Sequence, residues 1–130
     1  MARMNSRTIT LRPWQKTALE RLAATPGPDF LAVATPGAGK TTFALTAARQ
    51  SMATTPGQRL VVVVPTAHLK RQWAVAAAGL DLHLDPQWSA RDGRLPADMH
   101  GIAVTYQQVA SSAAALATVA RGAFVIFDEL

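Results

Sequence analysis

The segment from Ala34 to Thr42 combines two glycines with a lysine and two adjacent threonines, in the order Ala-Thr-Pro-Gly-Ala-Gly-Lys-Thr-Thr. Glycines let successive backbone N–H groups converge on one anion, and a helix that begins there adds the positive end of its dipole. This pattern is typical of a phosphate-binding loop, although Ala34 stands where the first glycine is usual. The alternative is an ordinary strand–turn–helix connection with a surface lysine, and the Gly-x-Gly-Lys-Thr-Thr spacing disfavours it.

Each side chain of this loop has an expected role. Lys40 would reach the β- and γ-phosphates of a nucleotide, and the hydroxyl of Thr41 would ligate magnesium. ATP and Mg²⁺ are therefore the predicted cofactors. The remaining residues of the predicted loop site are Thr35, Pro36, Gly37, Ala38, Gly39 and Thr42.

A second group with chemical potential is Asp128-Glu129, which follows the apolar run Val125-Ile-Phe127. A buried strand that ends in two carboxylates can hold Asp128 near the magnesium ion, while Glu129 polarises the attacking water as a general base. Acidic residues often simply end strands, so the pair alone is weak evidence. With a phosphate loop upstream, it favours hydrolysis over transfer of phosphate to a small acceptor.

The elements that must position these residues can be read from the apolar pattern. Strands are expected at 29–34, 60–64, 101–105 and 123–127, and the unbroken β-branched run Leu60–Val64 is typical of a strand that is covered on both faces. A helix is expected from Pro13 to the breaker sequence at 25–28, and another at 41–51 with Phe43 on its inner side. Later helices are indicated by the stripes Leu69, Trp73, Ala76, Leu80 and Tyr106, Val109, Ala113, Leu116. Residues 85–99 are expected to form a loop.

Strand and helix alternate from residue 29 onward, which predicts an α/β fold with a parallel sheet and helices on both faces. Ligands collect at the carboxyl ends of the strands in such sheets. The predicted fold class is thus a three-layer α/β/α P-loop NTPase that is incomplete at its C-terminus.

Composition restricts the function further. The chain of 130 residues has no cysteine, so thiolate metal sites are excluded, and His68, His83 and His100 lack metal-binding spacing. A net charge of +5 favours a polyanionic partner. No apolar run approaches the roughly 20 residues of a membrane span, and the first residues do not form a signal peptide. A cytoplasmic protein without a membrane partner is expected.

These motifs together resemble the superfamily 2 helicases and translocases, in their DEAD/DEAH-like or restriction-enzyme-like branch. The resemblance covers residues 11–130 as a partial N-terminal RecA-like helicase domain, after an extension at 1–10. Leu11-Arg-Pro-Trp-Gln15 looks like the adenine-recognition motif, which implies that Gln15 bonds the adenine edge and Arg12 helps to hold the base. Gln15 as an exposed helix residue is the alternative.

The resemblance also implies nucleic-acid contacts, with DNA favoured over RNA. Val64–Trp73 is similar to motif Ia, in which Pro65, Thr66 and Arg71 would face the backbone. Within it, Trp73 is expected in the core rather than as a base-stacking platform. Val104–Gln107 looks like the strand-end motif whose Thr105 and Gln107 lie on the same track, although Thr105 could simply cap a helix.

The resemblance implies, finally, that the chain stops inside motif II, before a second RecA-like domain. In related ATPases the strand after motif II inserts between the phosphate-loop strand and the motif II strand. We therefore expect unpaired backbone groups at that gap and poor folding of the 130 residues alone. An intact parent would hydrolyse ATP to ADP and phosphate while moving on nucleic acid. The alternatives are a P-loop phosphotransferase and a nucleotide-binding fragment without turnover.

Overall fold

The computed structural model of the chain describes residues 29–33, 38–91, 95, 98–120 and 122–128. Five strands in the described part form one sheet in the order β1-β5-β2-β4-β3, and every neighbouring pair is parallel. The strands are β1 (Asp29–Val33), β2 (Leu60–Val64), β3 (Leu84–Asp85), β4 (Gly101–Thr105) and β5 (Phe124–Asp128). The predicted α/β fold with a parallel sheet is confirmed.

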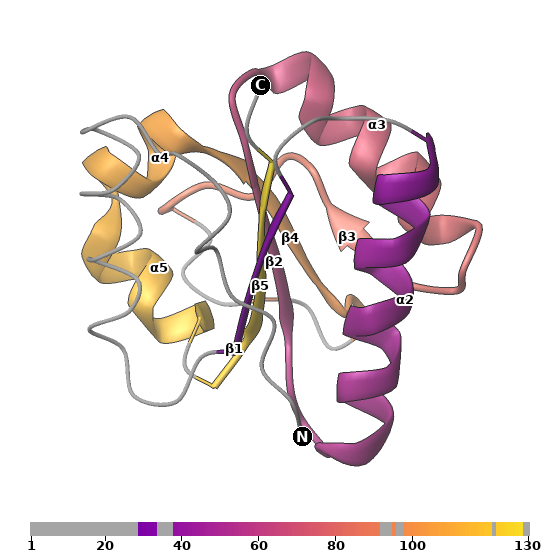
Figure 1. Cartoon of the computed structure of the whole chain (residues 1–130). Coiled ribbons are helices and arrows are strands. Elements are labelled where there is room, and N and C mark those ends of the chain that lie inside the picture. Colours follow the sequence, from indigo (N-terminus) through magenta and orange to yellow (C-terminus); the bar gives the residue numbers. More distant parts are fainter. Residues whose placement is uncertain (1–28, 34–37, 92–94, 96–97, 121, 129–130) are drawn as a thin grey trace.

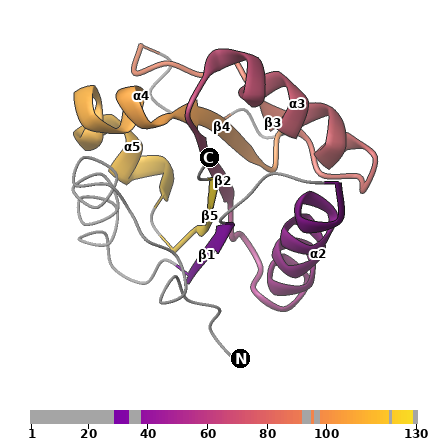
Figure 2. The same cartoon turned by 45° about the horizontal axis from the view of Figure 1, so that its top comes forward.

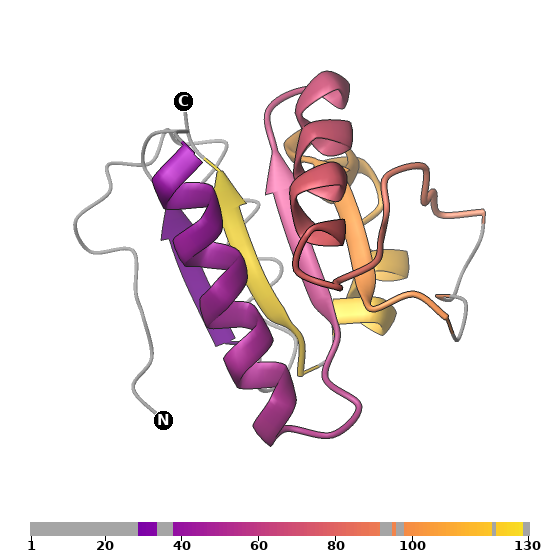
Figure 3. The same cartoon turned by 90° about the vertical axis from the view of Figure 1, so that its right-hand side faces the viewer.

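Helices cover both faces of this sheet (Figures 1 and 2). Helices α2 (Ala38–Thr54) and α3 (Ala67–Ala78) lie on one face, and α4 (Tyr106–Ser111) and α5 (Ala113–Ala120) lie on the other. Figure 3 shows α2 in front of β1 and β5, with α3 in front of β2 and β4. The result is the three-layer arrangement that the alternating pattern predicts.

Two apolar clusters fill the spaces between the layers. The side chains of β2 are all buried, and they alternate between the clusters because successive residues of a strand point to opposite faces. Val61 and Val63 pack under α4 and α5, whereas Leu60, Val62 and Val64 pack under α2 and α3. This double burial accounts for the continuous apolar sequence of the strand.

The expected gap in the sheet is absent. Strand β1 pairs directly with β5 in parallel, and the register runs from Asp29 opposite Phe124 to Val33 opposite Asp128. β5 in turn pairs with β2 on its other side. The expectation of unpaired backbone groups between β1 and β5 was therefore wrong for this chain, because the two strands close the space themselves.

Four local predictions also differ from the structure. Helix α2 begins at Ala38 and ends at Thr54, so it is longer than expected, and Phe43 is 54% exposed instead of lying on its inner side. The helix expected over 106–116 is two helices, because Ser112 leaves the helical conformation at φ −130° and ψ 34°. The short strand β3 includes Asp85, the first residue of the segment expected as a loop.

The helix predicted to start at Pro13 lies outside the described residues, as do Arg12, Gln15, Thr35, Pro36, Gly37 and Glu129. Within the part of the chain that is described, no helix has the length and apolar character needed to span a membrane.

Candidate nucleotide and metal site

Strand register brings the two predicted halves of the site together. Val33, the last residue of β1, lies opposite Asp128, the last residue of β5. The predicted phosphate loop follows Val33, and Ala38, Gly39 and Lys40 form the first turn of α2. The end of β1, the start of α2 and Asp128 therefore lie at the carboxyl end of the sheet, where α/β proteins bind their ligands.

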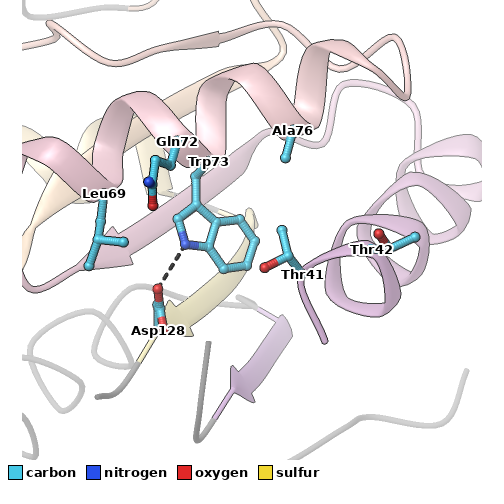
Figure 4. Close-up of a pocket in the computed structure, with 7 residues that line it drawn as sticks. All are labelled: Thr41, Thr42, Leu69, Gln72, Trp73, Ala76 and Asp128. Atoms are coloured by element: carbon cyan, nitrogen blue, oxygen red, sulfur yellow. Dashed lines mark hydrogen bonds between the residues drawn. The ribbon is translucent and has the colours of Figure 1, made fainter. Parts of the chain in front are cut away.

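A cleft of about 290 Å³ lies between the start of α2, the side of α3 and the end of β5. Thr41 and Asp128, the two residues predicted to ligate magnesium, both line it. Figure 4 shows the Trp73 ring extending from α3 into this region, with its N–H turned to Asp128 and its six-membered edge toward Thr41. The cleft is lined by Thr41, Thr42, Leu69, Gln72, Trp73, Ala76 and Asp128.

Asp128 is fully buried and is held at two of its atoms. The indole N–H of Trp73 donates to Oδ2 at 2.8 Å, and the hydroxyl of Tyr106 donates to the backbone carbonyl at 3.3 Å. Oδ1 is buried without a hydrogen-bond partner in the described part of the chain. Burial raises the pKa of the Asp128 carboxyl, and the hydrogen bond from Trp73 opposes that rise.

This donor set fits a magnesium ion. Mg²⁺ prefers oxygen ligands and is commonly held by one or two carboxylates together with phosphate oxygens. The unpartnered Oδ1 supplies a carboxylate oxygen, and the hydroxyl of Thr41 lies on the same cleft. A buried acceptor without a donor is costly, and a bound cation would remove that cost.

The residues predicted to meet nucleic acid lie at the starts of α3 and α4. Thr66 is the N-cap of α3, where its hydroxyl accepts from the backbone N–H of Leu69 at 3.3 Å. Pro65 is half-buried, whereas Thr66 and Arg71 are exposed. The prediction that Thr66 begins a helix is confirmed, and its role toward nucleic acid stays a prediction.

At α4 the alternative for Thr105 is confirmed, because it caps a helix. Its hydroxyl accepts from the backbone N–H of Gln108 at 3.1 Å, and the Gln108 side chain accepts from the backbone N–H of Thr105 at 3.0 Å. Gln107 is exposed beside this capping box. A contact of Thr105 or Gln107 with nucleic acid stays a prediction.

Sequence reasoning missed the role of Gln108. Its side chain also accepts from Lys70 Nζ at 3.2 Å and donates to the carbonyl of Trp88 at 3.1 Å, so it connects α4 to α3 and to the loop after β3. The Thr-x-x-Gln spacing of a capping box was a signal that could have identified it.

The polar contact of Trp73 was also missed. Periodicity placed Trp73 in the core, which is confirmed by its 3% exposure, but the pattern carried no sign of its bond to Asp128. Among the histidines, His83 and His100 stack with their ring centroids 5.4 Å apart. His100 Nδ1 accepts a hydrogen bond from the backbone N–H of His83, so this nitrogen has a structural role.

The fold is that of a three-layer α/β domain with a parallel sheet, and comparison with known proteins gives the family. The sequence matches the family described as type III restriction enzyme, res subunit, over residues 8–130, and the chain belongs to that family. Its members carry a helicase-like domain of superfamily 2, and an ATP-dependent, helicase-like function holds at the level of the family.

Relatives among curated proteins come from mycobacteria. The chain is 47% identical over 122 residues to an uncharacterized protein of Mycobacterium tuberculosis and 45% identical over 122 residues to one of Mycobacterium leprae. Each match covers 92% of the chain and 20% of the relative, so the chain spans about a fifth of the length of these relatives. No solved structure gives a significant match.

Proposed function

We propose that these residues form the ATP-binding part of a nucleic-acid helicase or translocase that hydrolyses ATP to ADP and phosphate. The observation that carries the proposal is the meeting of Thr41 and Asp128 at one cleft, at the carboxyl end of a parallel sheet and at the start of a helix. Membership of a helicase-like family supports the same reading.

In the proposed site, the phosphate loop and the amino end of α2 bind the phosphates of ATP. Lys40 neutralises the β- and γ-phosphates, and Glu129 takes a proton from the attacking water. Thr41 and Asp128 would hold a magnesium ion, which would supply positive charge to the phosphate oxygens. Arg12 and Gln15 would bind the adenine ring, as the family resemblance implies.

The partner that we propose is nucleic acid, with DNA favoured because the matched family is described as a restriction-enzyme subunit. Pro65, Thr66 and Arg71, with Thr105 and Gln107, would face it at the starts of α3 and α4. We further propose that the chain is part of a longer motor, whose second RecA-like domain completes the ATP site. The chain spans about a fifth of the length of its relatives, and this supports the proposal of a longer motor.

Two substitutions in the intact protein test the ATP site. Lys40→Ala should abolish ATP binding or turnover, because the phosphate charge is left without its lysine. Glu129→Gln should retain nucleotide binding and block hydrolysis, since an amide cannot act as the base. Binding is followed with a fluorescent ATP analogue and turnover by phosphate release. Normal turnover in Lys40→Ala would remove the phosphate-loop assignment, and unchanged turnover in Glu129→Gln would remove Glu129 as the base.

A further inference from the structure

Trp73 is a buried aromatic residue of α3 whose single polar atom reaches the last residue of β5. Its indole ring packs in the cluster under α2 and α3, and its N–H lies 2.8 Å from Oδ2 of Asp128. The indole nitrogen can only donate, so this bond requires an acceptor on Asp128. Bonds of this type to an ionised carboxylate are short and stronger than those between neutral groups.

Trp88 shows what a purely packing tryptophan looks like in the same chain. It is 1% exposed and lies in the cluster on the opposite face of the sheet, but its Nε1 has no hydrogen-bond partner in the described part of the chain. An indole can therefore fill the core of this protein without a polar contact. The bond that Trp73 makes is a feature beyond what packing requires.

The bond has a geometric consequence for the carboxylate. A carboxylate whose two oxygens are both free can rotate about its last torsion angle, which is broad for Asp. With Oδ2 held by Trp73, the plane of the group is fixed, and Oδ1 is left without a hydrogen-bond partner among the described residues. Partners of this kind orient metal ligands in many proteins.

We propose that Trp73 is a positioning residue for metal binding, which holds Oδ2 of Asp128 so that Oδ1 is presented to the magnesium ion of the bound nucleotide. This inference rests on the proposed function, because it requires Asp128 to ligate that ion. The same hydrogen bond links the proposed metal ligand directly to α3. This helix carries Thr66 at its N-cap and Arg71 on its surface.

The test compares Trp73→Phe with Trp88→Phe in the intact protein. Both substitutions replace a buried indole ring by the smaller phenyl ring, but only Trp73→Phe removes a hydrogen-bond donor to Asp128. Binding of a fluorescent ATP analogue is titrated with Mg²⁺ and also measured with the metal chelated. Trp73→Phe should raise the Mg²⁺ concentration for half-maximal binding about 10–100-fold, a larger loss than any change in the metal-free affinity. Trp88→Phe should change neither quantity.

A second comparison shows whether Trp73 acts through Asp128. In an Asp128→Ala background, Trp73→Phe should cause no further loss of Mg²⁺ dependence, because the carboxylate that it orients is gone. If Trp73→Phe does not fold, benzothienylalanine at position 73 replaces it, since that residue keeps the bicyclic shape and lacks the donor.

Three results would overturn the inference. These are an unchanged Mg²⁺ requirement in Trp73→Phe, an equal shift in Trp88→Phe, or a parallel loss of metal-free and Mg²⁺-dependent affinity, which would indicate a packing role alone. Failure of the wild-type protein to bind the ATP analogue under any condition would instead contradict the proposed function, so the two failures are distinguishable.

Discussion

At Asp128 a carboxylate without exposed surface accepts a hydrogen bond from the indole N–H of Trp73. Burial raises its pKa, so folding favours the neutral form when no metal is bound. The contribution of Asp128 to the free energy of unfolding is therefore most favourable in acid. It decreases as the pH rises from the unfolded pKa through the higher folded pKa.

We therefore expect Asp128→Asn to raise the melting temperature of the metal-free protein at neutral pH, because the buried charge is removed. This increase in melting temperature should be smaller in acid, where the wild-type carboxyl is also neutral. It should also be smaller when Mg²⁺ and nucleotide are bound, because they stabilise the charged carboxylate of the wild type. Thermal melts across the pH range, with and without Mg²⁺, measure it. A variant that is less stable than wild type at neutral pH would contradict this picture of Asp128.

Sequence patterns predicted the types of residue at the site better than their contacts. Thr41 and Asp128 were expected at one metal site, and both line one cleft. The partner of Trp73 is 55 residues away in sequence, and helical periodicity reports burial without naming the polar atom that a buried side chain meets. The prediction that Phe43 lies on the inner side of its helix was wrong for a related reason. Small residues on both sides of it left the buried face of the helix poorly defined in the sequence.

At the scale of elements, Gln107 and Gln108 are neighbours on α4 with different surroundings. Gln108 completes the capping box with Thr105 and contacts Lys70 and the carbonyl of Trp88, whereas Gln107 is exposed. Gln108→Ala should lower the free energy of unfolding by about 1–2 kcal/mol, through loss of the cap and of part-buried hydrogen bonds.

Gln107→Ala is the matched control, and it should leave stability within about 0.5 kcal/mol. Under the proposed function it should instead weaken binding to nucleic acid, measured by fluorescence anisotropy of a labelled oligonucleotide. Urea denaturation measures the stability of both variants. Equal destabilisation by the two substitutions would mean that the capping box does not hold α4 in place.

The pairing of β2 with β4 depends on a glycine. Gly101 lies opposite Leu60, and a Cβ added to it would come within 1.8 Å of the Leu60 carbonyl oxygen. Gly101→Ala should therefore cost about 1–3 kcal/mol or more, because backbone must move. In Gly79→Ala the nearest atom is the Ala76 carbonyl oxygen at 3.3 Å and φ is −65°, so a small adjustment suffices and that variant should lose less stability than Gly101→Ala in chemical denaturation. A neutral Gly101→Ala would show that the two strands can separate without loss.

Strands were the elements that the sequence predicted best. The residue bounds of β2 and β4 match the expected 60–64 and 101–105. β2 is an unbroken apolar run, and β4 has the apolar centre 102–104, and both runs are buried on two faces. The break at Ser112 was not visible in the alanine-rich sequence around it, since alanine suits a helix on either side of a break. The two-residue strand β3 is too short to produce a periodic pattern.

At the scale of the whole molecule, the sheet is continuous from β1 to β3, with helices on both faces. The expectation of poor folding depended on a gap that direct pairing of β1 with β5 closes. We now expect the 130-residue chain to unfold in one cooperative transition, with coincident curves from far-UV circular dichroism and tryptophan fluorescence. A broad melt with separate curves would mean that β1 is not stably paired in isolation.

We propose that the chain carries the ATP site of a nucleic-acid motor. The first test is to measure the rate of ATP hydrolysis by the intact protein with and without DNA or RNA. The Lys40→Ala variant is measured under the same conditions as the control. We predict that nucleic acid stimulates hydrolysis and that hydrolysis requires Mg²⁺. The substitution Lys40→Ala should abolish it. Hydrolysis that is indifferent to both nucleic acids, or transfer of the phosphate to a small acceptor, would contradict the motor assignment.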